Sequence, residues 1–325
     1  RGGSVVDGTG APARRADVAI EGERIAAIGP GLSGGRTLVA SGCVVAPGFV
    51  DIHTHYDAQV FWDPALTPSC FHRVTTVVAG NCGFSIAPTR PAQREVIART
   101  LENVEDMNAA TLAAGIPWDF ETHPEYLASI GRRGTALNFG AYVGHTAIRL
   151  YVMGDAAYER KASDEEVARM CQVVRESMQA GAVGLATSFA PTHLGIDGKP
   201  VPSRLADLSE FEAMARVLGE LGRGVVAVTP GQGFFREIYD FQRRVDVPLT
   251  YTALLAIPGF WQMGSKLNDE ENANGADVWP QVSCRKITMQ LRMSDPFQFN
   301  QAPCFQELMG RPRELRMARY RERAW

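Results

Sequence analysis

Residues 47–57 read PGFVDIHTHYD, an apolar extended segment that ends in two histidines two positions apart. Residues i and i+2 of a strand point to the same side, so His53 and His55 would project together. Neutral imidazoles suit zinc and its first-row neighbours. A bare H-x-H pattern is more often an ordinary strand with two surface histidines. Here Gly48 and Val50 indicate a turn into a buried strand, and polar residues follow at its carboxyl end, where open α/β folds place their chemistry. The stretch therefore predicts a metal site on a strand of an α/β fold.

A second segment of this kind lies at residues 74–83, which read VTTVVAGNCG. The β-branched run predicts a strand, and Cys82 follows it between Gly80 and Gly83, where the backbone can bend to present a side chain. We therefore predict Cys82 as a third metal ligand. The other cysteines are interpreted as small buried hydrophobes, because their spacing does not form a disulfide framework: Cys43, Cys70, Cys171, Cys284 and Cys304.

Residues 47–57, residues 74–88 (VTTVVAGNCGFSIAP) and residues 143–149 (VGHTAIR) resemble the amidohydrolase superfamily. The branch most similar is that of the N-acyl-D-amino-acid deacylases, or D-aminoacylases. Many two-metal amidohydrolases bridge their metals with a carbamylated lysine, whereas this branch carries a cysteine in the GNCG segment. The resemblance implies a zinc-dependent hydrolase of non-peptide carbon–nitrogen bonds that acts on N-acyl-D-amino acids.

From residue 47 onward, strand, loop and helix patterns alternate, which predicts a parallel sheet covered by helices. Helices are expected at residues 163–180, behind a capping signal, and at 209–221. The candidate strands lie near residues 48–53, 74–79, 136–143, 182–187, 224–229, 248–252 and 277–283. We interpret residues 47–325 as a (β/α)8 TIM-like barrel that lacks its last strand at the C-terminus.

Residues 1–46 alternate short extended segments with glycine turns, which predicts the N-terminal part of a small β-sandwich subdomain. Strands are expected at residues 4–7, 17–20, 25–28 and 37–40. The chain starts inside a strand-like segment and stops after a basic helical one, so we expect it to be a piece of a longer protein. An incomplete barrel exposes two sheet edges, and aggregation or instability is expected for the 325-residue chain.

In the family that the chain resembles, the last strand supplies an aspartate that binds metal and shuttles the proton. No residue of this chain can be assigned to that role, so no catalytic residue is assigned. The family also takes two histidine ligands from the ends of strands five and six. The corresponding residues 228–230 and 250–252 read VTP and TYT. We therefore expect one zinc ion, held by His53, His55 and Cys82, and the sequence does not support a second.

Three polar residues beyond the expected metal site are candidates for substrate binding. His145 follows a strand-like run and either contacts substrate or is a structural histidine. Arg149 could pair with the carboxylate of an N-acyl amino acid, or it is an ion-pair residue. His193 lies in the loop after strand four and is a candidate for lining the pocket. His72 and His123 are interpreted as structural.

Composition restricts the remaining possibilities. The net charge of −3 does not favour nucleic acid as a partner, and the arginines near the C-terminus are interrupted by acids and apolar residues. No apolar run is long enough for a membrane span, and no leader pattern opens the chain, so the protein is expected in the cytoplasm. The expected partner is a small-molecule substrate, and the oligomeric state is left open.

Two other functions remain open. A hydrolase of cyclic amides such as hydantoins or dihydropyrimidines would usually need a carbamylated lysine. None of the lysines ends a candidate strand in the right region: Lys161, Lys199, Lys266 and Lys286. A non-catalytic ligand-binding relative would fit the missing histidines of strands five and six, but not the retention of His53, His55 and Cys82. A serine hydrolase is disfavoured because no G-x-S-x-G elbow is present.

Overall fold

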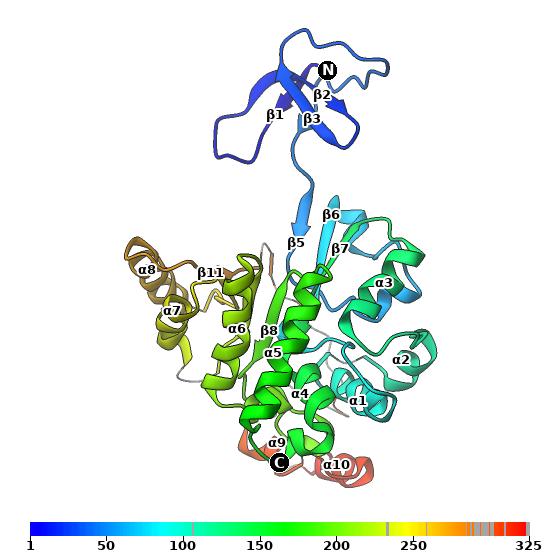
Figure 1. The fold of residues 1–325 in the computed structure, drawn as a ribbon, viewed down its shortest axis with the longest axis vertical. Coiled ribbons are helices and arrows are strands. Elements are labelled where there is room, and N and C mark those ends of the chain that lie inside the picture. The colour runs from blue at the N-terminus through cyan, green and yellow to red at the C-terminus, as the bar shows by residue number, and fades with distance from the viewer. Residues whose placement is uncertain are drawn as a thin grey trace.

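A curled, seven-stranded parallel sheet forms the centre of the molecule in the computed structural model (Figure 1). The structure describes residues 1–105, 107–231, 234–257, 259–283, 285–286, 288, 293, 299, 302–308 and 310–322. The strands pair in chain order: β5 (Phe49–Asp51), β6 (Val74–Ala79), β7 (Asn138–Gly144), β8 (Gly184–Ser188), β9 (Val225–Thr229), β10 (Leu249–Thr252) and β11 (Val278–Gln281). Each predicted barrel strand overlaps one of these, because short apolar runs bounded by glycine and polar residues mark the strands.

The helices follow the strands and cover the outer face of the sheet, as Figure 1 shows for α3, α5 and α6. Their bounds are α1 (Arg94–Glu105), α2 (Ala109–Gly115), α3 (His123–Arg133), α4 (His145–Met153), α5 (Asp164–Gln179), α6 (Leu208–Leu221), α7 (Phe234–Val245), α8 (Phe260–Ala273), α9 (Pro303–Gln306) and α10 (Arg313–Arg319). The expected capping signal of α5 is present, since the Ser163 hydroxyl accepts from the backbone N–H of Glu166.

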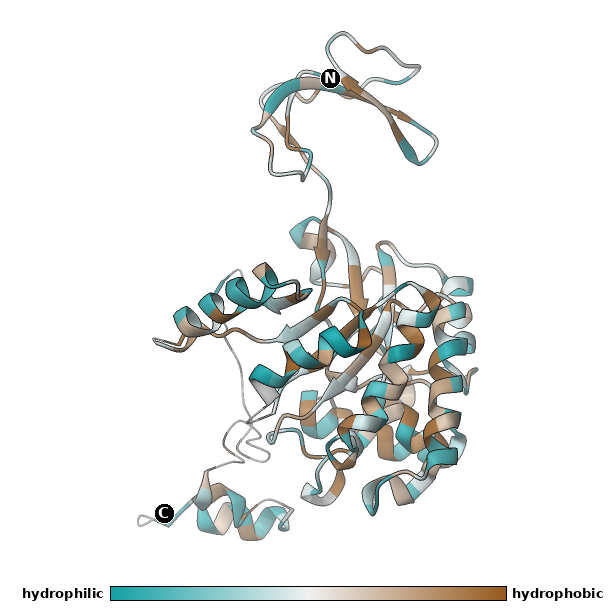
Figure 2. Ribbon diagram, turned by 60° about the vertical axis from the view of Figure 1, so that its left-hand side comes forward, coloured by the Kyte–Doolittle hydropathy of each residue, from teal (hydrophilic) through white to brown (hydrophobic). Residues whose placement is uncertain are grey.

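Apolar residues are concentrated in the strands and on the inner sides of the helices (Figure 2). One buried cluster joins β7 to β11 with α4 to α7, where Phe211 and Phe241 pack with Leu185 and Val226. A second cluster joins β6 to α1 and α3. This packing gives the strands a rigid support, from which the loops at their carboxyl ends project.

The N-terminal region forms a separate four-stranded sheet in the order β3, β2, β1, β4. Its strands are β1 (Gly3–Val5), β2 (Arg14–Glu21), β3 (Arg24–Gly29) and β4 (Val44–Val45). Figure 1 shows this sheet at one end of the molecule, joined to β5 by an extended segment. The strand expected at residues 37–40 is wrong: Leu38 and Val39 are exposed, and β4 pairs with β1 instead. The assignment of residues 1–46 to a β-sandwich subdomain stays a prediction.

The two edges of the central sheet, β5 and β11, approach each other without pairing. Large apolar side chains are exposed on both, with Phe49 66% exposed on β5 and Trp279 60% exposed on β11. At their carboxyl ends, however, His53 and Gln281 are in hydrogen-bond contact at 2.6 Å. The sheet is therefore a partial barrel whose edges meet at the end where the polar residues lie.

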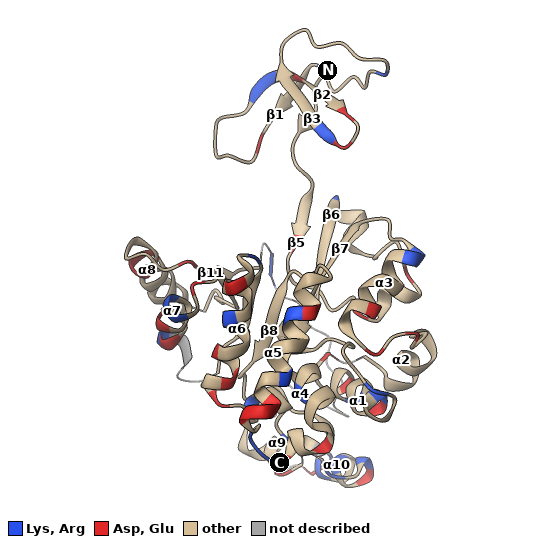
Figure 3. Cartoon of the chain, viewed as in Figure 1, with Lys and Arg blue, Asp and Glu red and all other residues tan. Residues whose placement is uncertain are grey.

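Charged residues of both signs are interspersed on the helices (Figure 3). Arg319 of α10, for example, pairs with Glu307 and Glu322, as expected for a solvated helix face. None of the described helices is long and apolar enough to span a membrane.

Candidate metal centre

Two adjacent strands deliver the three predicted metal ligands to one point. His53 and His55 follow β5, and Cys82 lies in the short 3₁₀ turn Asn81–Gly83 that follows β6. One donor atom from each of the three residues lies within 4.8 Å of the other two. The structure therefore brings together the histidine pair and the cysteine, which are 27 or more positions apart in the sequence.

The glycines beside Cys82 let the turn pack tightly. Gly80 has a φ of 78°, and a Cβ added there would lie 2.4 Å from the carbonyl oxygen of Tyr142. Cys82 itself has a φ of 57°, in the left-handed region that most side chains avoid. Asp57 holds the turn in place, because its carboxylate accepts a 3.0 Å hydrogen bond from the Gly80 backbone N–H. The GNCG pattern is thus needed for the backbone path that presents the thiol.

His53 is oriented by residues from the far edge of the sheet. Its Nδ1 lies 2.6 Å from Oε1 of Gln281 and 3.1 Å from Oγ1 of Thr252. The Thr252 hydroxyl donates to the same Gln281 oxygen at 2.7 Å. When Nδ1 donates to that oxygen, the lone pair of the ring is on Nε2, which lies 3.5 Å from the Cys82 sulfur. This arrangement leaves Nε2 available for a metal.

His55 lies against a carboxylate that belongs to a helix. Its Nε2 is 3.3 Å from Oε1 of Glu105, the last residue of α1. Its Nδ1 is buried and has no hydrogen-bond partner among the described residues. Burial, with the nearby His53 and His193, lowers the pKa of His55 to about 3, so the ring is neutral and able to bind a metal.

Burial raises the pKa values of the acidic groups around the site, so a nearby cation would favour their ionised forms. Burial raises the pKa of Glu105 to about 8, and the Asp57 carboxylate adds to the shift. Burial likewise raises the pKa of Asp57 to about 7 and that of the Cys82 thiol above its ordinary range. Two imidazoles and a thiol that converge at one point match the donor set of a zinc site. The residues present therefore fit the metal that the sequence predicts.

His145 and Arg149 belong to a buried network instead of the metal cluster. Both ring nitrogens of His145 are engaged, Nδ1 with Thr187 at 2.8 Å and Nε2 with Glu210 at 2.8 Å. Arg149 is 0% exposed, pairs with the same carboxylate and donates to the Arg160 carbonyl at 2.9 Å. These contacts engage both ring nitrogens of His145 and the two terminal guanidinium nitrogens of Arg149, which favours the structural alternative for both residues.

His193 lies closer to the candidate metal ligands than His145 or Arg149 does, because it packs beside the GNCG turn. Its ring packs edge-on against Phe84, the residue after the GNCG turn, with centroids 5.1 Å apart. Its Nδ1 is 2.6 Å from the Ser188 hydroxyl at the end of β8. Burial lowers the pKa of His193 to about 4, and the charges of Arg204 and His53 act in the same direction. His193 is thus a neutral ring near His53. The other two histidines lie apart: His72 is in a 3₁₀ turn before β6, and His123 is buried at the start of α3.

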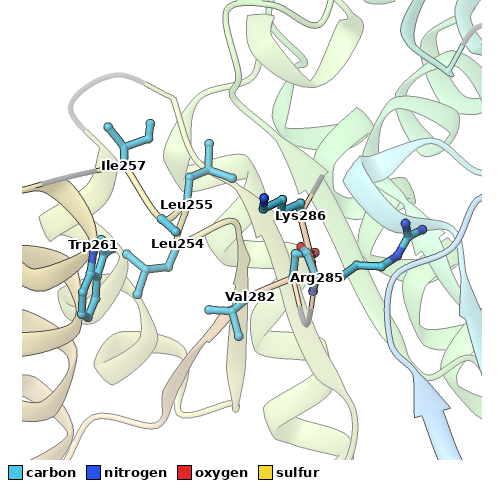
Figure 4. Close-up of a pocket in the computed structure, with 9 residues that line it drawn as sticks. Leu254, Leu255, Ile257, Trp261, Val282, Arg285 and Lys286 are labelled. Atoms are coloured by element: carbon cyan, nitrogen blue, oxygen red, sulfur yellow. Dashed lines mark hydrogen bonds between the residues drawn. The ribbon is translucent and has the colours of Figure 1, made fainter. Parts of the chain in front are cut away.

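A cavity of about 390 Å³ lies beside this site, past the ends of β10 and β11. Figure 4 shows its apolar side chains, among them Leu254 and Trp261, on the side of α8, with Lys286 and Arg285 on the opposite side. The cavity begins one residue after Gln281, which contacts His53. It could hold a small molecule with an apolar part and an anionic part.

Four residues that contact the cluster or its supporting turn were not identified from the sequence: Asp57, Glu105, Thr252 and Gln281. Asp57 carried a signal, since it closes the PGFVDIHTHYD stretch. Thr252 and Gln281 end predicted strands, and all strand ends of a parallel sheet meet at one edge. Glu105 carried no signal, because its position depends on how α1 packs.

The amidohydrolase family model matches residues 37–275 of the chain. A curated D-aminoacylase of Alcaligenes xylosoxydans xylosoxydans is 34% identical over 265 residues, which is 80% of this chain and 51% of the relative. The chain thus spans about half the length of this relative.

Two solved structures have the same fold. One is a D-aminoacylase described with a binuclear metal centre, with one-metal activation and second-metal attenuation; it is 30% identical, with a TM-score of 0.65. The other is an N-acyl-D-glutamate deacylase from Bordetella bronchiseptica, complexed with zinc and a phosphonate inhibitor that mimics the tetrahedral intermediate; it is 27% identical, with a TM-score of 0.63. Each alignment covers 85% of this chain and 56% of the other.

Proposed function

This chain belongs to the amidohydrolase family, and we propose that it carries the zinc site of an enzyme that hydrolyses the amide bond of N-acyl-D-amino acids. The observation that carries the proposal is the convergence of His53, His55 and Cys82 within 4.8 Å. The similarity to a D-aminoacylase and to a zinc-containing deacylase supports the substrate class. We propose one zinc ion, since one-metal activation is described for the D-aminoacylase relative.

Each residue of the cluster has a defined task in this proposal. His53, His55 and Cys82 hold the ion, and Gln281 keeps the His53 lone pair on Nε2 by accepting from Nδ1. Asp57 and the two glycines keep the Cys82 backbone in its left-handed turn. A bound zinc supplies two effects, a lower pKa of a water molecule, from about 16 to about 7, and polarisation of the amide carbonyl.

We propose that the substrate lies in the cavity between β10, β11 and α8. The apolar wall at Leu254 and Trp261 would take the acyl group or side chain, and Lys286 would take the carboxylate. His193, the neutral ring near His53, would line the other side. His145 and Arg149 pair with Glu210 and would hold α4 against α6 instead of contacting substrate.

The test is metal content and hydrolysis measured on the same samples. We expect about one zinc per chain by elemental analysis, with release of free amino acid from N-acetyl-D-amino acids and not from the L-enantiomers. Cys82→Ala should lose both, whereas Cys70→Ala, which changes a thiol outside the cluster, should lose neither. Hydantoin turnover with no D-amino-acid release would favour the cyclic-amide alternative. Wild type without metal would contradict the proposal.

A further inference from the structure

Helix α1 ends at Glu105, which places an acidic side chain at the C-terminal end of a helix, where a negative charge is unfavourable. Ile97, Leu101 and Val104 bury one side of the helix in the core, and this packing places Glu105 against His55. The C-terminal end of a helix carries partial negative charge, so an acid there is destabilised. In the part of the chain that the structure describes, no lysine or arginine pairs with Glu105. The surroundings of this carboxylate would be favourable if a cation were present.

The distances around the cluster match those between ligands that share one ion. Bonds of about 2.0–2.1 Å to nitrogen or oxygen and about 2.3 Å to sulfur, at tetrahedral angles, put neighbouring donors roughly 3.3–3.6 Å apart. The Cys82 sulfur is 3.5 Å from Nε2 of His53. The Glu105 oxygen is 3.3 Å from Nε2 of His55. Both separations lie in the range expected for two donors that bind the same ion.

Glu105 stands beside His55, outside the set of three donors that are all within 4.8 Å of one another. The last torsion of a glutamate side chain is broad, so its carboxylate can rotate at little cost. Such a rotation changes the distance between the carboxylate oxygens and the other donors without any movement of the α1 backbone. Glutamate oxygen is also a normal zinc ligand in a mixed nitrogen and carboxylate set.

We propose that Glu105 is a protein ligand of the ion held by His53, His55 and Cys82, so that a helix supplies the carboxylate of this site. This inference rests on the metal site of the proposed function. It adds a donor from the end of α1, in a chain whose strands β9 and β10 end in Thr229 and Thr252 without a histidine.

The test is metal binding by Glu105→Gln, which keeps the shape of the side chain and removes its charge. We expect the zinc dissociation constant, measured by chelator competition, to rise by more than about 100-fold, beyond the roughly 10–100-fold that is typical of outer-sphere partners. With Co²⁺ in place of zinc, the ligand-field bands should change while the thiolate charge-transfer band of Cys82 persists. Glu95→Gln removes the same charge from the exposed start of α1 and should leave both readouts unchanged.

A glutamine at position 105 can still accept a hydrogen bond from His55, but it is a poor metal ligand. Unchanged ligand-field bands, with zinc affinity within about threefold of wild type, would therefore overturn the inference. Folding is checked on the metal-free proteins: Glu105→Gln should melt at or above the wild-type temperature, since a neutral amide is easier to bury. Adding zinc should then raise its melting temperature less than that of the wild type. If the wild type binds no metal, the proposed function fails. If the wild type binds metal through Cys82 and Glu105→Gln leaves zinc affinity unchanged, only this inference fails.

Discussion

At the scale of single residues, the site depends on backbone conformations that most side chains avoid. Gly80 and Cys82 both have positive φ, and Gly80 lies against the backbone of β7. The thiol is presented because Asp57 holds the turn through the Gly80 N–H. The metal cluster is therefore as sensitive to its supporting turn as to its ligands.

Gly80→Ala should destabilise the protein strongly. An added Cβ would lie 2.4 Å from the Tyr142 carbonyl oxygen, so the turn or β7 must shift. We expect a loss of about 3 kcal/mol or more in the free energy of unfolding, measured by urea denaturation. Gly10→Ala is the matched control: it has a similar φ of 85°, but nothing lies within 4 Å of its added Cβ. It should cost only about 1–2 kcal/mol from backbone strain. Equal losses would contradict the steric argument.

Lys286→Gln should raise KM for an N-acetyl-D-amino acid by about tenfold with kcat little changed, because a charge-assisted hydrogen bond to the carboxylate would be lost. Lys266→Gln, on the exposed side of α8 next to Glu270, should change neither constant. The measurement is initial-rate kinetics on the three proteins. A fall in kcat with unchanged KM would place Lys286 outside substrate binding.

At the scale of elements, a buried ion pair connects α4 to α6. Glu210 of α6 pairs with both His145 and Arg149, the first and fifth residues of α4. Although burial acts in the opposite direction, the hydrogen bonds and charges of His145 and Arg149 lower the pKa of Glu210 below its ordinary value of 4.5. This pairing fixes α4 directly behind β7, whose carboxyl end packs against the GNCG turn.

Glu210→Gln should therefore cost about 3–5 kcal/mol at neutral pH, because it leaves the Arg149 charge buried without a counter-ion. A carboxylate whose folded pKa is depressed stabilises above its unfolded pKa and loses this contribution as the pH falls through the folded pKa. The difference in melting temperature between wild type and variant should thus be largest above about pH 5 and become smaller below about pH 4. Glu212→Gln, a partly exposed neighbour paired with Arg216 and Arg244, should cost at most about 1 kcal/mol. A pH-independent difference would contradict the ion-pair account.

At the scale of the whole molecule, the central sheet has two open edges. β5 and β11 expose Phe49 and Trp279, whereas natural edge strands usually carry charge or a covering element. The contact between His53 and Gln281 closes the site end but pairs no backbone along the edges. The apolar rows on these strands are accordingly the surfaces through which copies of the chain would associate.

We expect the 325-residue chain to aggregate on concentration, with Trp279→Lys raising the monomer fraction in size-exclusion chromatography, because a charge on an edge strand disfavours pairing. Val39→Lys, at an exposed apolar position in the N-terminal region, should help less. A wild-type chain that stays monomeric on concentration would contradict this expectation.

The sequence by itself determined the parallel strands and the candidate metal ligands at their ends. Strand period, glycine turns and the H-x-H spacing are local, and the carboxyl ends of parallel strands necessarily meet at one edge of a sheet. Tertiary packing alone decided which other side chains reach that edge, Glu105 through the packing of α1 and Gln281 and Thr252 through the curl of the sheet. It also decided that Arg149 is buried against Glu210 instead of facing the site. Such contacts join residues far apart in the chain, and no local pattern encodes them.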